Sequence, residues 1–252
     1  MTTYGESAPA GDLYKHFGIT AEAVANADNM ADLFERLEKG GVLMRLDPNV
    51  IPDMFHGATI SKDEVAQLRR INNVVRKGRV TRINTDSIQF AEGHIPTTAN
   101  TLHIDCSARA VPVSETYDVF QGDTIVVQTV RSYQPVFSAA FIAHIEASYD
   151  SDDIKNEICQ VVPLPNHDTD WIVGMAAQMK NQFRWGKEAG IREWLLNNRL
   201  DGFTQLAMPN PDNTPEENAV LMRLKEAAPK AAQNVPKLIG EAMMIRHAKP
   251  YQ

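Results

Sequence analysis

Residues 74–108, VVRKGRVTRINTDSIQFAEGHIPTTANTLHIDCSA, are the stretch that decides the fold. Within it, residues 75–83, residues 87–90 and residues 101–106 alternate apolar with polar side chains or are rich in β-branched residues. A period of two is typical of a half-buried strand. Asn84-Thr85-Asp86 offers the side chains that a tight reversal needs, so the first two segments form an antiparallel pair. The stretch predicts a β-meander that leads into a third strand.

The third predicted strand carries the polar residues of most interest. Its alternation places His103 and Asp105 on one face, with apolar side chains on the other. Ser107 and Ala108 follow directly, and small residues let the backbone approach a ligand closely. Ligands of open α/β sheets collect at the carboxyl ends of strands, so this end is a candidate binding site. An edge strand with a solvated polar face explains the same pattern equally well.

A second candidate site follows the apolar segment Thr124–Val130, TIVVQTV, which predicts a central strand. A polar loop that includes Arg131 comes next, and a helix is predicted over residues 136–148. The N-terminus of a helix favours anions, and arginine can bind a carboxylate or a phosphate with two parallel hydrogen bonds. His144 lies on an apolar part of this helix, where we expect a packed core histidine.

The remainder of the chain predicts mainly helices. We expect a leader with short helices over residues 1–28, an α/β region with the meander over 29–150, and a helical carboxyl region over 151–252. The fold class is therefore α/β, or α+β, with a small mixed sheet. Residues 201–213 predict a linker, and Thr214-Pro215-Glu216-Glu217 predicts a helix start by its capping box. Pro229 and Pro236 are expected to divide the last helical segment.

Composition narrows the function. A formal net charge of -7 argues against a protein that binds nucleic acid by neutralising phosphates. The longest apolar run is too short to span a bilayer, and the first twelve residues lack a secretory signal, so we expect no membrane contact. Two cysteines, Cys106 and Cys159, form no C-x-x-C pair and indicate a cytoplasmic protein. One H-x-D motif without H-x-x-x-H or paired cysteines predicts no metal site.

The meander and its strand end resemble the two-domain flavoproteins of the flavin monooxygenase and pyridine nucleotide-disulfide reductase type. Their corresponding strand ends in Ala-Thr-Gly, whereas this chain has Asp105-Cys106-Ser107-Ala108. FAD/NAD(P)-dependent oxidoreductases of an actinobacterial type are more similar, with a D-C-[ST]-A ending and a run like QPVFSAAFIAHIE over residues 134–146. The resemblance covers roughly residues 30–205 and implies an FAD-dependent oxidoreductase, with NAD(P)H as a further cofactor and a small-molecule substrate.

By this resemblance a few polar or small side chains would line the FAD site: Asp105, Ser107, Ala108, Arg131, Gln134 and Ser138. The catalytic residues are not identified by it. The G-x-G-x-x-G turn that holds the FAD pyrophosphate in such proteins does not occur in the chain. We therefore expect a nucleotide-binding partner subunit or self-association to complete the enzyme. The alternative function is a non-catalytic binding or assembly subunit that keeps the scaffold without a cofactor.

Overall fold

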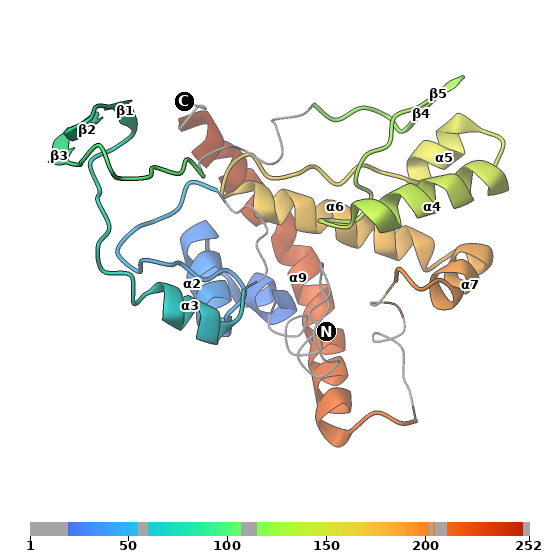
Figure 1. The fold of residues 1–252 in the computed structure, drawn as a ribbon. Coiled ribbons are helices and arrows are strands. Elements are labelled where there is room, and N and C mark those ends of the chain that lie inside the picture. Colours follow the sequence, from blue (N-terminus) through green and yellow to red (C-terminus); the bar gives the residue numbers. More distant parts are fainter. Residues whose placement is uncertain (1–19, 55–59, 107–114, 202–203, 205–210, 249–252) are drawn as a thin grey trace. The chain divides into compact units, whose positions relative to one another are not determined.

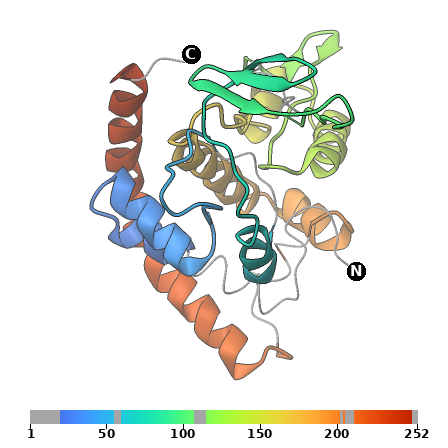
Figure 2. The same cartoon turned by 60° about the vertical axis from the view of Figure 1, so that its left-hand side comes forward.

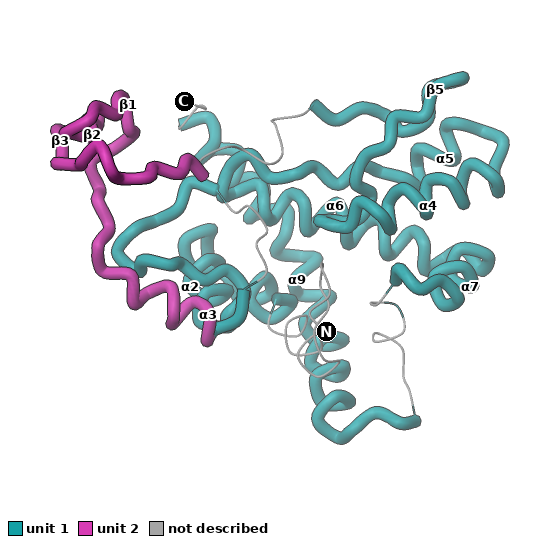
Figure 3. The backbone as a smooth tube through the Cα atoms, in the orientation of Figure 1, with its two compact units in different colours: residues 1–62, 114–252 teal, residues 63–113 magenta. Residues whose placement is uncertain are grey.

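The chain forms two compact units, coloured separately in Figure 3. Unit 1 comprises residues 1–62 and 114–252, and unit 2 comprises residues 63–113. Helices occur together with two small antiparallel sheets, which confirms the predicted α/β or α+β class. The residues that this computed structural model describes are 20–54, 60–106, 115–201, 204 and 211–248.

Unit 1 is mainly helical. A short helix over residues 20–26 precedes its named elements. These are α2 (Met30–Gly40), β4 (Phe120–Gln121), β5 (Thr124–Ile125), α4 (Pro135–Ser148), α5 (Asp152–Ile158), α6 (Asp170–Trp185), α7 (Ala189–Asn197) and α9 (Pro215–Ala248), all labelled in Figure 1. The expected helix over 136–148 is thus confirmed as α4. The predicted cap of α9 is confirmed as well, because Thr214 and Glu217 exchange hydrogen bonds of 2.8 to 3.2 Å.

The first core of unit 1 is aromatic and lies between α4, α5, α6 and α7. Phe141 is fully buried, with its ring centroid 4.4 Å from that of Trp185 and 5.5 Å from that of Trp194. The indole N–H of Trp185 donates to the carbonyl oxygen of Ile158 over 2.8 Å, which satisfies the one polar group that this buried ring carries. Packed aromatic rings, together with the hydrogen bond of Trp185, therefore join the end of α6 to α4, α5 and α7.

The second core of unit 1 lies where residues 20–27, α2 and the start of α6 pack on α9. Both Figure 1 and Figure 2 show α2 and α6 against the long α9. Leu33 and Leu37, one turn apart on α2, are fully buried here, as is Leu238 of α9. The amide of Asn234 donates to the carbonyl oxygens of Val24 and Ala27, so α9 also caps the end of the first helix.

Unit 2 contains the meander and α3 (Lys62–Leu68), except for Lys62, which belongs to unit 1. Strands β1 (Val80–Ile83), β2 (Ser87–Phe90) and β3 (Gly93–Pro96) pair antiparallel in that order, which confirms the β-meander. The third strand is not the one predicted. Residues 101–106 have no strand structure. The chain instead reverses directly after β2 at Gly93, whose φ of 108° is a conformation that glycine adopts easily.

Two further expectations are wrong. The segment Thr124–Val130 is no central strand, because only Thr124 and Ile125 pair, and Val127 is 59% exposed. The backbone of Val130 is instead satisfied by side chains, through bonds with Ser138 and Asn181. Pro229 and Pro236 do not divide the last helix, since α9 runs through both. Each proline removes one backbone hydrogen bond from the helix. The burial of Ala231, Leu238 and Ala242 in the second core offsets that cost.

A search of the described helices finds none whose length and apolar character would let it cross a membrane.

Candidate functional site

Arg131 is the centre of the candidate site, and it lies in the turn that precedes α4. Only 1% of the residue is exposed. Its Nη1 donates to Oδ1 of Asp201 over 2.9 Å, and its guanidinium carbon lies 3.8 Å from the ring centroid of Phe137 and 5.3 Å from that of Trp185. Both charges are out of solvent, so each needs the other. Arg131 therefore joins the aromatic core to the segment that follows α7.

Ser138 and Gln134 lie on the first turn of α4 and at its N-cap. The hydroxyl of Ser138 donates to the carbonyl oxygen of Gln134 over 2.8 Å and accepts from the backbone N–H of Val130 over 3.1 Å. This buried side chain thus holds the segment between Val130 and Gln134, which precedes α4, in place. The side-chain oxygen Oε1 of Gln134 is buried and has no hydrogen-bond partner in the part of the chain that the structure describes. Of these two residues, Gln134 keeps an acceptor for a ligand.

Two amides on α6 complete the surroundings of this turn. Gln178 Oε1 accepts from the backbone N–H of Ser132 over 3.0 Å, and Asn181 Nδ2 donates to the carbonyl oxygen of Val130 over 2.8 Å. Tyr133, which follows Ser132 in the chain, has a φ of 55°, which is uncommon for a residue with a side chain. Side chains of α6 therefore hold the turn before α4 in place.

Sequence reasoning missed Gln178, Asn181 and Asp201. All three are buried polar residues, and each reaches the turn from at least 46 positions away in the chain. Asp201 lies at the start of the segment that the sequence predicted as a linker. A buried arginine always requires a carboxylate or its equivalent, but nothing local to Arg131 indicates which one.

The remaining predicted residues fall elsewhere. Asp105 belongs to unit 2, where it is exposed, and Ser107 and Ala108 lie outside the described residues. His103, also in unit 2, is bonded through Nε2 to the hydroxyl of Thr97 over 3.2 Å. Arg131, Gln134 and Ser138 lie together at and before the start of α4 in unit 1, whereas Asp105 lies in unit 2.

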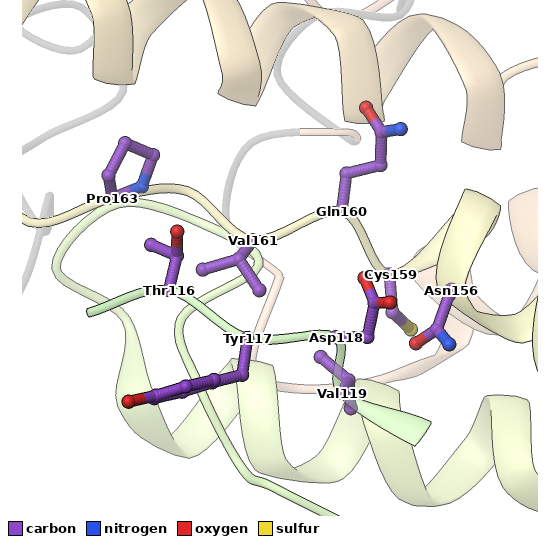
Figure 4. A pocket seen from close by; sticks show the side chains of 9 residues that line it. All are labelled: Thr116, Tyr117, Asp118, Val119, Asn156, Cys159, Gln160, Val161 and Pro163. Carbon is purple, nitrogen blue, oxygen red and sulfur yellow. The ribbon is translucent and has the colours of Figure 1, made fainter. Parts of the chain in front are cut away.

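A depression of about 530 Å³ opens in unit 1 between residues 116–119 and residues 156–163 (Figure 4). Asn156 lines it but is engaged, because its amide oxygen accepts from the N–H of Phe120 and its Nδ2 donates to the carbonyl of the same residue. Cys159 also lines it. Burial raises the pKa of that thiol to about 12, so the thiolate is negligible at neutral pH. The depression therefore offers a polar surface without an activated cysteine.

His144 is half-buried, and its ring stacks on that of Trp194 with the centroids 4.9 Å apart. Burial lowers the pKa of His144, which favours the neutral ring that stacks on the indole. His144 is thus a packing residue, as we expected. Among the described residues no group of three or more His, Cys, Asp and Glu side chains could hold a metal ion.

Comparison with known proteins finds longer relatives. The chain is 38% identical over 226 residues to a protein of Mycobacterium bovis and to proteins of two Mycobacterium tuberculosis strains, each named only as uncharacterized. The match covers 90% of this chain but only 42% of the length of each relative. No protein-family model matches the chain, and no solved structure gives a significant match.

Proposed function

We propose that this chain is one part of a larger FAD-dependent oxidoreductase, in which it contributes a wall of the flavin and substrate pocket. The observation that carries the proposal is the length of the mycobacterial relatives, because a match over 90% of this chain occupies only 42% of them. Their other part has room for the pyrophosphate-binding turn that this sequence lacks. Of the features on which the resemblance to flavoproteins depends, the meander and the helix that begins after Gln134 are present, whereas residues 101–106 form no strand.

The residues assigned to FAD by resemblance do not fit that role equally. Arg131 and Ser138 do not fit, because their polar groups hold the core together at almost complete burial. Gln134 fits, since its buried acceptor has no partner in the described part of the structure and a flavin ring carries an N–H donor. Bound flavin would supply the redox chemistry, and Gln134 would orient the ring by one hydrogen bond. An NAD(P)H donor and a small-molecule substrate belong to the same proposal.

A cytoplasmic setting is part of this proposal. Cys106 is an exposed free thiol and Cys159 a buried one, and both survive best in a reducing compartment.

The test is the absorption spectrum of the native complex, isolated through a tag on this chain, with the released cofactor identified after denaturation. We expect the flavin bands in the near ultraviolet and the blue. Gln134→Ala should lower the flavin content, whereas Gln233→Ala, an exposed glutamine on α9, should leave it unchanged. A colourless complex that takes up no added FAD would overturn the proposal.

A second function is favoured by the structural role of Arg131. If the conspicuous polar residues before α4 serve only the core, the chain is a non-catalytic binding or assembly subunit. A partner that co-purifies in fixed proportion, without flavin and without turnover, is the result that this reading requires. The same purification therefore separates the two functions.

A further inference from the structure

The segment that leads into the meander carries an unusual charge for this chain. Over residues 69–85 the sequence has no aspartate or glutamate, although the whole chain has a net charge of -7. The basic residues of this segment are Arg69, Arg70, Arg76, Lys77, Arg79 and Arg82. All of them are exposed except Lys77, which is half-buried. We call strands β1–β3 together with this segment the basic meander; over residues 69–96 its six basic residues outnumber two acidic ones, Asp86 and Glu92.

Strand register gathers polar side chains on one face of the basic meander. Arg82 of β1 pairs with Gln89 of β2, which in turn pairs with His94 of β3. All three are exposed, and they lie on the face opposite to Ile88 and Phe90, because side chains alternate along β2. β1 is also an edge strand, so the long arginine side chains along it can reach beyond the sheet. Nothing else in unit 2 covers this row among the residues described.

Unit 1 has a surface of the opposite charge. Between Glu115 and Glu157 the sequence has only two lysine or arginine residues, Arg131 and Lys155. Arg131 is buried with Asp201, and the buried Lys155 is already paired, because its Nζ lies 2.7 Å from a carboxylate oxygen of Glu146 and 2.8 Å from one of Asp152. The exposed carboxylates around them are therefore not balanced by nearby exposed cations of that segment. They are Asp118, Asp123, Asp150 and Asp153.

These carboxylates belong to one continuous piece of structure, the β4–β5 ribbon and the start of α5, which we call the acidic ribbon. The backbone N–H of Gly122, at the tip of β4–β5, donates to Asp152 over 2.7 Å, and Asn156 bonds Phe120 twice. The ribbon also presents two apolar side chains, since Ile125 is 43% and Val127 is 59% exposed. It thus combines fixed negative charge with uncovered apolar area.

We propose that the basic meander of one copy of this chain binds the acidic ribbon of a second copy. Like charge prevents two basic meanders from pairing face to face, and it prevents two acidic ribbons from doing so. The contact is therefore between unlike surfaces, and two such contacts made reciprocally close a dimer with a two-fold axis. The inference is independent of the proposed oxidoreductase function, because it uses no residue of the Arg131 cluster.

A second copy fits the basic meander better than a nucleic acid does. The net charge of -7 opposes the approach of a polyanion, and the acidic ribbon supplies carboxylates with apolar contacts at short range. Exposed ion pairs are individually weak, so association has to depend on several of them together and on low salt.

The experiment is sedimentation equilibrium of the full chain, at low salt and again at about 0.5 M salt, where screening acts over only a few ångströms. We expect a dimer at low salt that dissociates at high salt. Arg82→Glu should weaken the dimer by roughly tenfold or more, because it places like charges together. Arg199→Glu makes the same change of charge at an exposed arginine of unit 1 and should have little effect.

Charge exchange makes the test specific. Asp153→Lys should weaken the dimer as Arg82→Glu does, whereas an equimolar mixture of the two variants should associate, since one of the two reciprocal contacts regains opposite charges and the other is unchanged. A monomeric wild-type chain at low salt would overturn the proposal, and so would a dimer that Arg82→Glu leaves intact. A monomer that instead binds a labelled oligonucleotide through Arg82 would also overturn it, in favour of a nucleic-acid surface.

Discussion

The aromatic core of unit 1 and the meander of unit 2 differ in what stabilises them, side-chain burial in the core and backbone hydrogen bonds in the meander. In the aromatic core Phe141, Trp185 and Ile145 are fully buried, and even a charged residue, Arg131, has almost no exposed area. In the meander Val80 and Ile83 stay half exposed, and the sheet is held by its own backbone ladder. The core is closed within its unit, whereas the sheet keeps an exposed face that carries Arg82, Gln89 and His94.

The difference shows what the conspicuous polar residues do. Ser138, Asn181 and Asn156 spend their hydrogen bonds on backbone groups of irregular segments, which allows those segments to be buried without a regular ladder. In the meander the polar residues Arg82, Gln89 and His94 face solvent and remain available to another molecule. A buried polar residue at the start of α4 is therefore weaker evidence of a binding site than a row of exposed polar residues on a sheet face.

The two cysteines give the largest expected contrast between the regions. Cys159 lies in the aromatic core with its pKa raised to about 12, whereas Cys106 of unit 2 is exposed. At pH 8 the Cys159 thiolate is about one part in ten thousand, and only the thiolate reacts. We expect one thiol to react with Ellman's reagent at once and the other only after unfolding, with Cys106→Ser removing the fast phase. Two fast thiols would show that the core opens readily.

Removal of one partner of the buried ion pair should have the next largest effect. Arg131→Ala leaves the carboxylate of Asp201 buried without its cation, which should lower the free energy of unfolding by about 3–5 kcal/mol. Urea denaturation followed by tryptophan fluorescence measures this, with Arg199→Ala as an exposed control. A stable Arg131→Ala protein that had lost only turnover would contradict the structural role and return Arg131 to the flavin site.

Truncation of one apolar side chain in each region compares them directly. Phe141→Ala should cost about 3–4 kcal/mol in the packed core, and Ile83→Ala, at a half-exposed position, about 1 kcal/mol or less. Equal losses in thermal or urea denaturation would mean that the meander is as well covered as the core.

The smallest effect is expected at the tip of the β4–β5 ribbon. Hydrogen bonds from Lys155 and from the backbone N–H of Gly122 lower the pKa of Asp152 from its ordinary value of 3.8. The stability that this carboxylate contributes is therefore present above that ordinary value and is lost as the pH falls through the lowered pKa. Asp152→Asn should flatten the decline of stability as the pH falls below 3.8, and an unchanged decline would refute the contribution of the bonds from Gly122 and Lys155.

Local patterns in the sequence were sufficient for the meander and for the start of α9. Turn residues such as Asn84-Thr85-Asp86 and the Thr214–Glu217 capping box act within a few positions, so the sequence reports them directly. The third strand was misplaced because the alternation over residues 101–106 outweighed the tight reversal at Gly93.

The surroundings of Arg131 could not be read in this way. Its carboxylate partner is 70 positions further along the chain, and the amides that fix the turn come from α6. TIVVQTV has the composition of a central strand, but tertiary hydrogen bonds to Val130 replace the ladder that such a strand would need. The same long-range burial keeps α9 helical through Pro229 and Pro236.

Native-state hydrogen exchange, followed by mass spectrometry on the full chain, tests the contrast between the two regions most directly. At high salt we predict strong protection of the amides of α4 and α6 and fast exchange across β1–β3, because few apolar contacts stabilise the uncovered sheet. At low salt the exchange of β1–β3 should slow while that of α4 and α6 stays unchanged. A meander protected as strongly as α6 under both conditions would contradict the view that it awaits another surface.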